Sequence, residues 1–277
     1  MKYKTPQAFR IALTERLRNQ ALTEGTDLQR LFRLVSFERF LARLSLHEPT
    51  RNWVVKGGYA LELRFDGFAR ATKDLDLNIH PSTPDLLDLL QEAAEQECHD
   101  YFTYYISQPK KHTLTGPPEG GTRFVVDAHI GKRFTSFHLD CGQGDVPIGT
   151  IEHIKNKVDL SFAGVGTSYF PVYPIVDQFA EKLHAYTRPR ERENSRLKDI
   201  LDMWLFIRYG LTNDNALRQA IQSTFEVYGT HAVPDRLPLP PESWLSAFEH
   251  QKEFVGIDSN ASLQDVHKII ADFLRNF

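Results

Sequence analysis

Two carboxylates, two residues apart in a short alternating segment, are the side chains of this chain best suited to chemistry. Residues 74–79 alternate polar and apolar, which predicts a β-strand with its apolar residues on one face. Asp74 and Asp76 then project together from the other face, ~6.5–7 Å apart along the strand. Two like charges held side by side need a compensating cation or basic group. Since Mg²⁺ prefers oxygen ligands, the pair is a candidate metal site, although solvated strand faces carry such pairs as well.

A glycine turn lies shortly before this strand. Gly57 and Gly58 follow Lys56, the last residue of a short predicted strand over 52–56, and lead into a predicted helix that ends near Phe65. Backbone N–H groups at a helix start bind phosphate oxygens, and the carboxylates would bind divalent metal. A site that moves a nucleoside triphosphate needs both parts, so their combination indicates nucleotidyl transfer.

A third carboxylate would complete such a site, and a predicted hairpin around Gly131-Lys132 offers two. With a two-residue turn, residue 130 pairs with 133, 127 with 136, and 123 with 140. Asp127 and Asp140 then lie ~13 Å apart and cannot bind the same metal. Asp140 ends its strand before Gly142, where the backbone opens and a ligand can approach. We therefore choose Asp140 and interpret Asp127 as a solvated or cross-strand polar residue.

The surrounding elements follow from caps and apolar periodicity. Two helices are predicted to begin at Thr5-Pro6 and at Thr26-Asp27. Beyond the site strand, we expect a helix over 81–99, a strand over 101–107, a polar loop over 109–121, and helices over 174–187, 195–209, 212–228, 241–255 and 261–276. This order predicts an α/β (α+β) fold with a small mixed sheet. The expected domains are an N-terminal helical flank (1–50), a core (51–165) and a C-terminal helical domain (166–277).

Composition sets broad limits on the function. The 277 residues include two cysteines, which form no disulfide framework, and no run approaches the ~18–20 apolar residues of a membrane span. Without a hydrophobic signal region behind Met1, we expect a cytoplasmic protein. The net charge of −3 argues against a general polyanion binder. Residues 1–50 carry nine Lys or Arg and five Asp or Glu. This excess of positive charge is compatible with a surface that faces RNA and with the solvent-exposed faces of amphipathic helices.

A lysine and an aspartate in the C-terminal half lie where apolar residues are expected. Lys182 falls on the apolar stripe of the helix over 174–187, together with Ile175, Phe179 and Tyr186. Asp202 interrupts an apolar run and needs a partner, because burying an unpaired charge is costly. Lys182 is a plausible partner. The lysine either forms a structural salt bridge or reaches a nucleotide.

These motifs together resemble those of the AbiEii/AbiGii-type nucleotidyltransferase toxins over about residues 50–210. The matching segments are Lys56-Gly57-Gly58-Tyr59-Ala60-Leu61, Arg70-x-Thr72-x-Asp74-x-Asp76-Leu77, Phe137-His138-Leu139-Asp140 with Gly142-x-Gly144-Asp145, Ala180-Glu181-Lys182-Leu183-His184-Ala185, and Arg196-Leu197-Lys198-Asp199-Ile200-Leu201-Asp202. The family often has Ser where this chain has Thr72, whose hydroxyl can also bind a phosphate oxygen.

The resemblance implies the minimal nucleotidyltransferase fold of the polymerase-beta superfamily. It also implies a toxin that transfers a nucleoside monophosphate from a triphosphate to a tRNA 3′ end, with a cognate antitoxin encoded beside it. Two alternatives remain: an antibiotic-type nucleotidyltransferase acting on a small molecule, and a nucleotide-binding interaction protein without turnover.

The implied site has a metal-binding part and a nucleotide-binding part. Mg²⁺ or Mn²⁺ would bind Asp74, Asp76 and Asp140, and Asp140 would also help deprotonate the acceptor. The nucleotide would be bound by Lys56, Gly57, Gly58, Thr72 and Lys182, with Asp202 as a support and Asp199 either supporting or contacting substrate.

Overall fold

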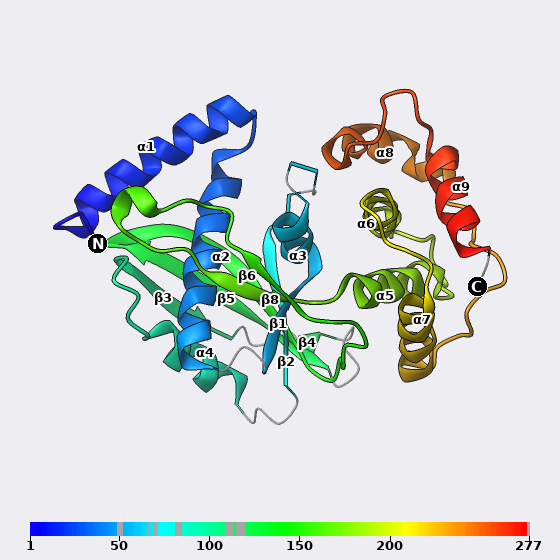
Figure 1. Cartoon of the computed structure of the whole chain (residues 1–277), viewed down its shortest axis with the longest axis horizontal. Coiled ribbons are helices and arrows are strands. Elements are labelled where there is room, and N and C mark those ends of the chain that lie inside the picture. Colours follow the sequence, from blue (N-terminus) through cyan, green and yellow to red (C-terminus); the bar gives the residue numbers. More distant parts are fainter. Residues whose placement is uncertain are drawn as a thin grey trace. The chain divides into compact units, whose positions relative to one another are not determined.

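The computed structural model describes residues 1–48, 52–65, 67–68, 71–80, 85–108, 113–114 and 120–275. Arg70 of the first motif and residues 81–84 of the helix predicted over 81–99 lie outside these ranges. The chain divides into two compact units (Figure 1). The first comprises Met1–Arg64, Ala71–Asp145 and Glu152–Val172, and the second Phe65–Arg70, Val146–Ile151 and Tyr173–Phe277.

The first unit is built on a mixed sheet with the strand order β3-β5-β6-β2-β1-β8-β7, and β4 pairs with β5. The strands are β1 (Trp53–Lys56), β2 (Asp74–Ile79), β3 (Phe102–Ser107), β4 (Thr113–Leu114), β5 (Gly121–Ile130), β6 (Lys132–Gly142), β7 (Glu152–Lys155) and β8 (Tyr169–Val172). β2 runs parallel to β6 and antiparallel to β1, which in turn runs parallel to β8. The strand that carries two of the predicted metal ligands therefore lies inside the sheet.

Three of these strands have no counterpart in the sequence-based expectation. The four residues of β7, Glu152–Lys155, do not alternate between polar and apolar, and β8 contains Pro171, which argues against a strand. β4 lies within the predicted polar loop and exists through its two-residue pairing with β5. β8 belongs to the sheet of the first unit, although its residues fall in the range expected for the C-terminal domain.

The two N-terminal helices begin at their predicted caps. Thr5 accepts a hydrogen bond from the Ala8 amide at the start of α1 (Pro6–Glu24), which ends at Gly25 with φ +63°. Asp27 accepts from the Gln29 amide at the start of α2 (Leu28–His47). The side chains satisfy backbone donors that the first helical turn leaves without partners.

The core lies on one face of the sheet, where α2 crosses the strands (Figure 1). The ring of Phe37 from α2 packs edge-on against Phe137 of β6, with 4.7 Å between centroids. Leu75, Leu77 and Ile79 of β2 are buried in the same hydrophobic cluster. Because side chains alternate along a strand, Asp74 and Asp76 project from the opposite face.

Two shorter helices complete the first unit. α3 (Gly57–Arg64) connects to β1 directly through Gly57. α4 (Leu86–Ala94) begins at its cap Asp85 and ends before the predicted His99. The helix cannot run to residue 99, since His99 adopts a positive φ of 48°, outside the helical region.

The second unit is helical, as predicted. Its helices are α5 (Ile175–Thr187), α6 (Leu197–Arg208), α7 (Asn215–Tyr228), α8 (Leu245–Gln251) and α9 (Leu263–Leu274). The predicted helix over 241–255 is shorter, because 3₁₀ turns at Glu242–Trp244 and Glu253–Val255 flank α8. Among the described helices, none has the length and apolar character needed to cross a membrane.

Candidate active site

The predicted carboxylates meet on the sheet face opposite the core. β2 and β6 are neighbouring parallel strands in which Asp76 lies directly opposite Asp140. Asp74 precedes Asp76 by two residues and therefore points the same way. Adjacent strands are about 4.8 Å apart, so the three carboxyl groups share one small surface.

The hairpin that carries Asp140 differs from its prediction at both ends, since its turn is shorter and β6 continues past Asp140 through Gly142. Ile130 pairs with Lys132 around Gly131, rather than with Arg133, and a bulge follows between Ala128 and His129. The bulge absorbs the extra residue on β6, so the predicted pairing of 127 with 136 and of 123 with 140 is confirmed. Asp127 forms an ion pair with Arg133 at 3.2 Å, in agreement with its interpretation as a cross-strand polar residue.

An arginine that the sequence analysis did not select lies among the carboxylates. Arg123 of β5 donates from Nε to Asp140 Oδ1 at 2.7 Å and from Nη2 to Asp140 Oδ2 at 2.6 Å. The same Nη2 lies 3.7 Å from Asp74 Oδ2. The hydrogen bonds to Asp140 raise the pKa of Arg123 above its ordinary value. The predicted register already placed residue 123 opposite Asp140, so the signal for this contact was present in the sequence.

Two further side chains position Asp74. His138 of β6 lies opposite Asp74 in the strand register, with 3.3 Å between Nδ1 and Asp74 Oδ1. Thr72, the predicted phosphate ligand, is buried and donates its hydroxyl to the Asp74 carbonyl at 3.0 Å. Its backbone amide donates to the Glu62 carboxylate of α3 at 2.8 Å. The residues that enter β2 are thus tied to the helix after the glycine turn.

Gly57 leaves room for the carboxylate of Asp76. A Cβ atom added to Gly57 would lie 1.9 Å from Oδ2 of Asp76, and φ of Gly57 is +59°. Both observations require glycine here, since L side chains rarely adopt this backbone conformation. Gly58 is the next residue of α3 and is buried. The Asp76 carboxylate therefore lies directly against the start of the helix.

Lys56 lies opposite Asp76 in the antiparallel pairing of β1 with β2. Its ammonium donates to Oδ2 of Asp145 at 2.6 Å, and both side chains are mostly buried. The carbonyl of Asp145 in turn accepts from Nδ2 of Asn78 at 2.8 Å. These contacts hold the segment after β6 against β1 and β2.

The remaining predicted site residues gather within the second unit. Lys182 of α5 donates to Oδ2 of Asp202 at 2.6 Å and to Oδ1 of Asp199 at 3.4 Å, both on α6. Asp202 is fully buried. The predicted pairing of Lys182 with Asp202 is therefore confirmed, and Asp199 joins it.

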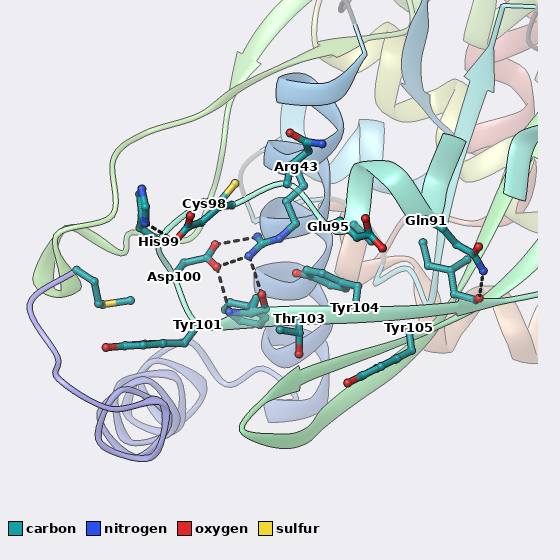
Figure 2. A pocket seen from close by; sticks show the side chains of 16 residues that line it. Arg43, Gln91, Glu95, Cys98, His99, Asp100, Tyr101, Thr103, Tyr104 and Tyr105 are labelled. Atoms are coloured by element: carbon teal, nitrogen blue, oxygen red, sulfur yellow. Dashed lines mark hydrogen bonds and ion pairs between the residues drawn. The ribbon is translucent and has the colours of Figure 1, made fainter. Parts of the chain in front are cut away.

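A separate pocket of about 840 Å³ lies between the end of α4 and β3. In Figure 2, Arg43 reaches from α2 toward Asp100 at its wall. Asp100 is fully buried and accepts charge-assisted hydrogen bonds from Arg43 and from Arg39, at 2.5 and 2.6 Å respectively. Burial would raise the pKa of Asp100, but the two arginines outweigh it and hold that pKa below its ordinary value. This acid is a structural counter-ion.

The chemistry of the carboxylate face fits a hard divalent cation. Three aspartates supply oxygen donors from adjacent strand positions, as Mg²⁺ prefers. In the part of the chain that the structure describes, no set of three or more His, Cys, Asp or Glu side chains is already arranged as a metal cage. Two of the three carboxylates, those of Asp140 and Asp74, lie instead against the guanidinium of Arg123.

Comparison with known proteins agrees with this architecture. The family model described as nucleotidyl transferase AbiEii toxin, type IV toxin–antitoxin system, matches residues 39–275. The fold resembles that of MenT4, a nucleotidyltransferase toxin from Mycobacterium tuberculosis H37Rv, with a TM-score of 0.61 and 16% identity over 95% of this chain and 94% of that chain. No curated protein sequence matches significantly. The predicted fold class and family are confirmed: the chain is a nucleotidyltransferase and belongs to the AbiEii family of type IV toxin–antitoxin toxins.

Proposed function

We propose that this toxin transfers a nucleoside monophosphate from a nucleoside triphosphate to the 3′ end of a tRNA, in a reaction that depends on Mg²⁺ or Mn²⁺. The observation that carries the proposal is the register of β2 and β6, which sets Asp76 opposite Asp140 with Asp74 beside them. The choice of tRNA as acceptor follows from the family resemblance, as does a cognate antitoxin as partner.

Each carboxylate has a proposed task. Asp74 and Asp76 would hold the divalent cations, and Asp140 would complete one of these sites. Bound Mg²⁺ would supply Lewis-acid stabilisation of the charge on the phosphate oxygens. Asp140 would also accept the proton of the acceptor hydroxyl, which prepares that oxygen for attack.

The phosphates would be bound by backbone and by cationic groups. The amides of Gly57 and Gly58 begin α3, where the N–H groups of the first turn have no partner within their own helix. Because Gly57 has no side chain, the Asp76 carboxylate lies next to these amides. The phosphate-binding amides and this metal ligand would therefore be neighbours. For Lys182, we propose that the ammonium stabilises the leaving pyrophosphate, with Asp202 and Asp199 holding it in position.

The test is transfer of label from each radiolabelled nucleoside triphosphate to total RNA in the presence of Mg²⁺. The wild type should label RNA at tRNA 3′ ends, and Asp76→Asn should lower the rate at least about 100-fold. Asp127→Asn is the matched control, since Asp127 lies on the same sheet but pairs with Arg133, and it should keep wild-type activity.

Four outcomes would reject the proposal. Absence of transfer by the wild type, or undiminished transfer by Asp76→Asn, would reject the assignment of the carboxylates. Label on a small acceptor and never on RNA would identify an antibiotic-type enzyme. Nucleotide binding without pyrophosphate release would identify an interaction protein.

A further inference from the structure

Arg123 holds both oxygens of one proposed metal ligand. Its Nε and Nη2 bond Oδ1 and Oδ2 of Asp140 at 2.7 and 2.6 Å, a two-point contact between a planar guanidinium and a carboxylate. Nη2 also reaches Asp74 at 3.7 Å. The Asp140 side chain is only 11% exposed, so its carboxylate has few hydrogen bonds to water and depends on Arg123 as a partner.

The charge balance of the face explains why an arginine lies there. Asp74, Asp76 and Asp140 place three like charges on adjacent strand positions, which is unfavourable without a nearby cation. Arg123 is a protein side chain that supplies this positive charge to Asp74 and Asp140.

A metal ion at Asp140 would bind an oxygen that already accepts a hydrogen bond from Arg123. Carboxylate oxygens bind Mg²⁺ at about 2.0–2.1 Å, which brings the ion into the volume around the carboxylate that the guanidinium nitrogens approach. Two cations at such short distance repel each other. The Arg123 side chain is 30% exposed, so it has a side toward solvent into which it can withdraw.

We propose that Arg123 is a positioning residue that competes with the divalent metal for Asp140 and Asp74. It holds these carboxylates in register while the metal is absent, and it moves away as the metal binds. The inference rests on the proposed function, in which the same carboxylates are metal ligands.

A purely orienting role for Arg123 predicts an effect of the opposite sign. Removing a residue that only orients a metal ligand typically weakens metal affinity, by about 10–100-fold. Removing a competitor strengthens it. The sign of the change in metal affinity therefore separates the two roles, without any measurement of turnover.

The experiment is a titration of the full-length protein with Mn²⁺ without nucleotide, followed by the electron paramagnetic resonance signal of free Mn²⁺. Arg123→Gln should bind Mn²⁺ at least about tenfold more tightly than the wild type. Arg133→Gln is the matched control, since Arg133 pairs with Asp127 on the same hairpin, and it should leave the affinity unchanged. Equal or weaker binding by Arg123→Gln would overturn the inference.

Two additions keep the result interpretable. Arg123→Lys keeps a charge but loses the two-point contact, so it should tighten Mn²⁺ binding by a smaller factor, and it replaces Arg123→Gln if that variant fails to fold. Asp76→Asn should weaken Mn²⁺ binding. If Asp76→Asn weakens Mn²⁺ binding while neither Arg123 variant binds Mn²⁺ more tightly, Arg123 does not compete with the metal, and the proposed function stands. Undiminished binding by Asp76→Asn would instead reject the metal site itself.

Discussion

Gly57→Ala tests whether the glycine turn exists to admit the Asp76 carboxylate. The added methyl carbon would lie 1.9 Å from Oδ2 and 2.5 Å from Cγ of Asp76, whereas ordinary contacts begin at 3.4 Å. The carboxylate must therefore move by roughly 1.5 Å to reach a normal separation. We expect the variant to fold and to lose nucleotidyl transfer.

The structure separates two contributions to this loss. Alanine at φ +59° costs about 1–2 kcal/mol of folding free energy, whatever surrounds it. Gly25→Ala carries the same backbone cost at φ +63°, but no atom lies within 4 Å of its added carbon. Misplacing a reacting group by about 1 Å lowers rates about 100-fold, so Gly57→Ala should lose at least that factor and Gly25→Ala should lose none.

The assay combines label transfer with urea unfolding of four proteins: wild type, Gly57→Ala, Asp76→Ala and the double variant. Asp76→Ala removes the two closest atoms and leaves only the Asp76 Cβ at 2.9 Å from the added carbon. Gly57→Ala should therefore destabilise the Asp76→Ala background less than the wild type. A coupling free energy of about 0.5–3 kcal/mol is expected for groups in contact. Folded Gly57→Ala protein with activity within threefold of wild type, or coupling near zero, would refute the reasoning.

Three further predictions concern buried charges. Asp202→Ala removes the 2.6 Å partner of Lys182 and should lower the free energy of unfolding by about 3–5 kcal/mol in urea titration, whereas an unchanged midpoint would contradict a stabilising role for this ion pair. Burial raises the pKa of Glu38 to about 7, so the folded state takes up a proton that the unfolded state lacks between about pH 4.5 and 7. The free energy of unfolding of the wild type, relative to that of Glu38→Gln, should therefore fall as pH rises through this range. A difference between the two proteins that does not change with pH would contradict the raised pKa. The pKa of Asp100 is lowered by Arg43 and Arg39, so its contribution to stability should be present at neutral pH and weaken on acidification; Asp100→Asn, compared by thermal unfolding at pH 7 and pH 3, should be more destabilising at the higher pH.

Local sequence signals predicted the parts of the fold that depend on neighbouring residues. The caps Thr5 and Asp27 placed the first two helices, and the alternation over 74–79 placed β2. The apolar stripe around Lys182 predicted its pairing with Asp202, since a buried charge needs a partner. In each case the contact depends on how residues are spaced along one helix or strand, or along two.

What the sequence did not predict depends on strand order and on side-chain volume. No local period reveals that β2 lies beside β6. Asp140 was selected from its place near Gly142, and that choice does not predict that Asp140 lies directly opposite Asp76. β8 contains Pro171, which argues against a strand in the sequence, although β8 pairs with β1 inside the sheet. Arg123 could have been found from the predicted register, whereas the contact of Gly57 with Asp76 requires three-dimensional coordinates.

The most direct test of the carboxylate site is a crystal structure of the protein with Mn²⁺ and a non-hydrolysable nucleoside triphosphate, using the anomalous signal of manganese. The account predicts a manganese peak bound by oxygens of Asp74 and Asp76, on the sheet face that also carries Asp140. A nucleotide bound elsewhere, or manganese that touches none of these three carboxylates, would contradict it.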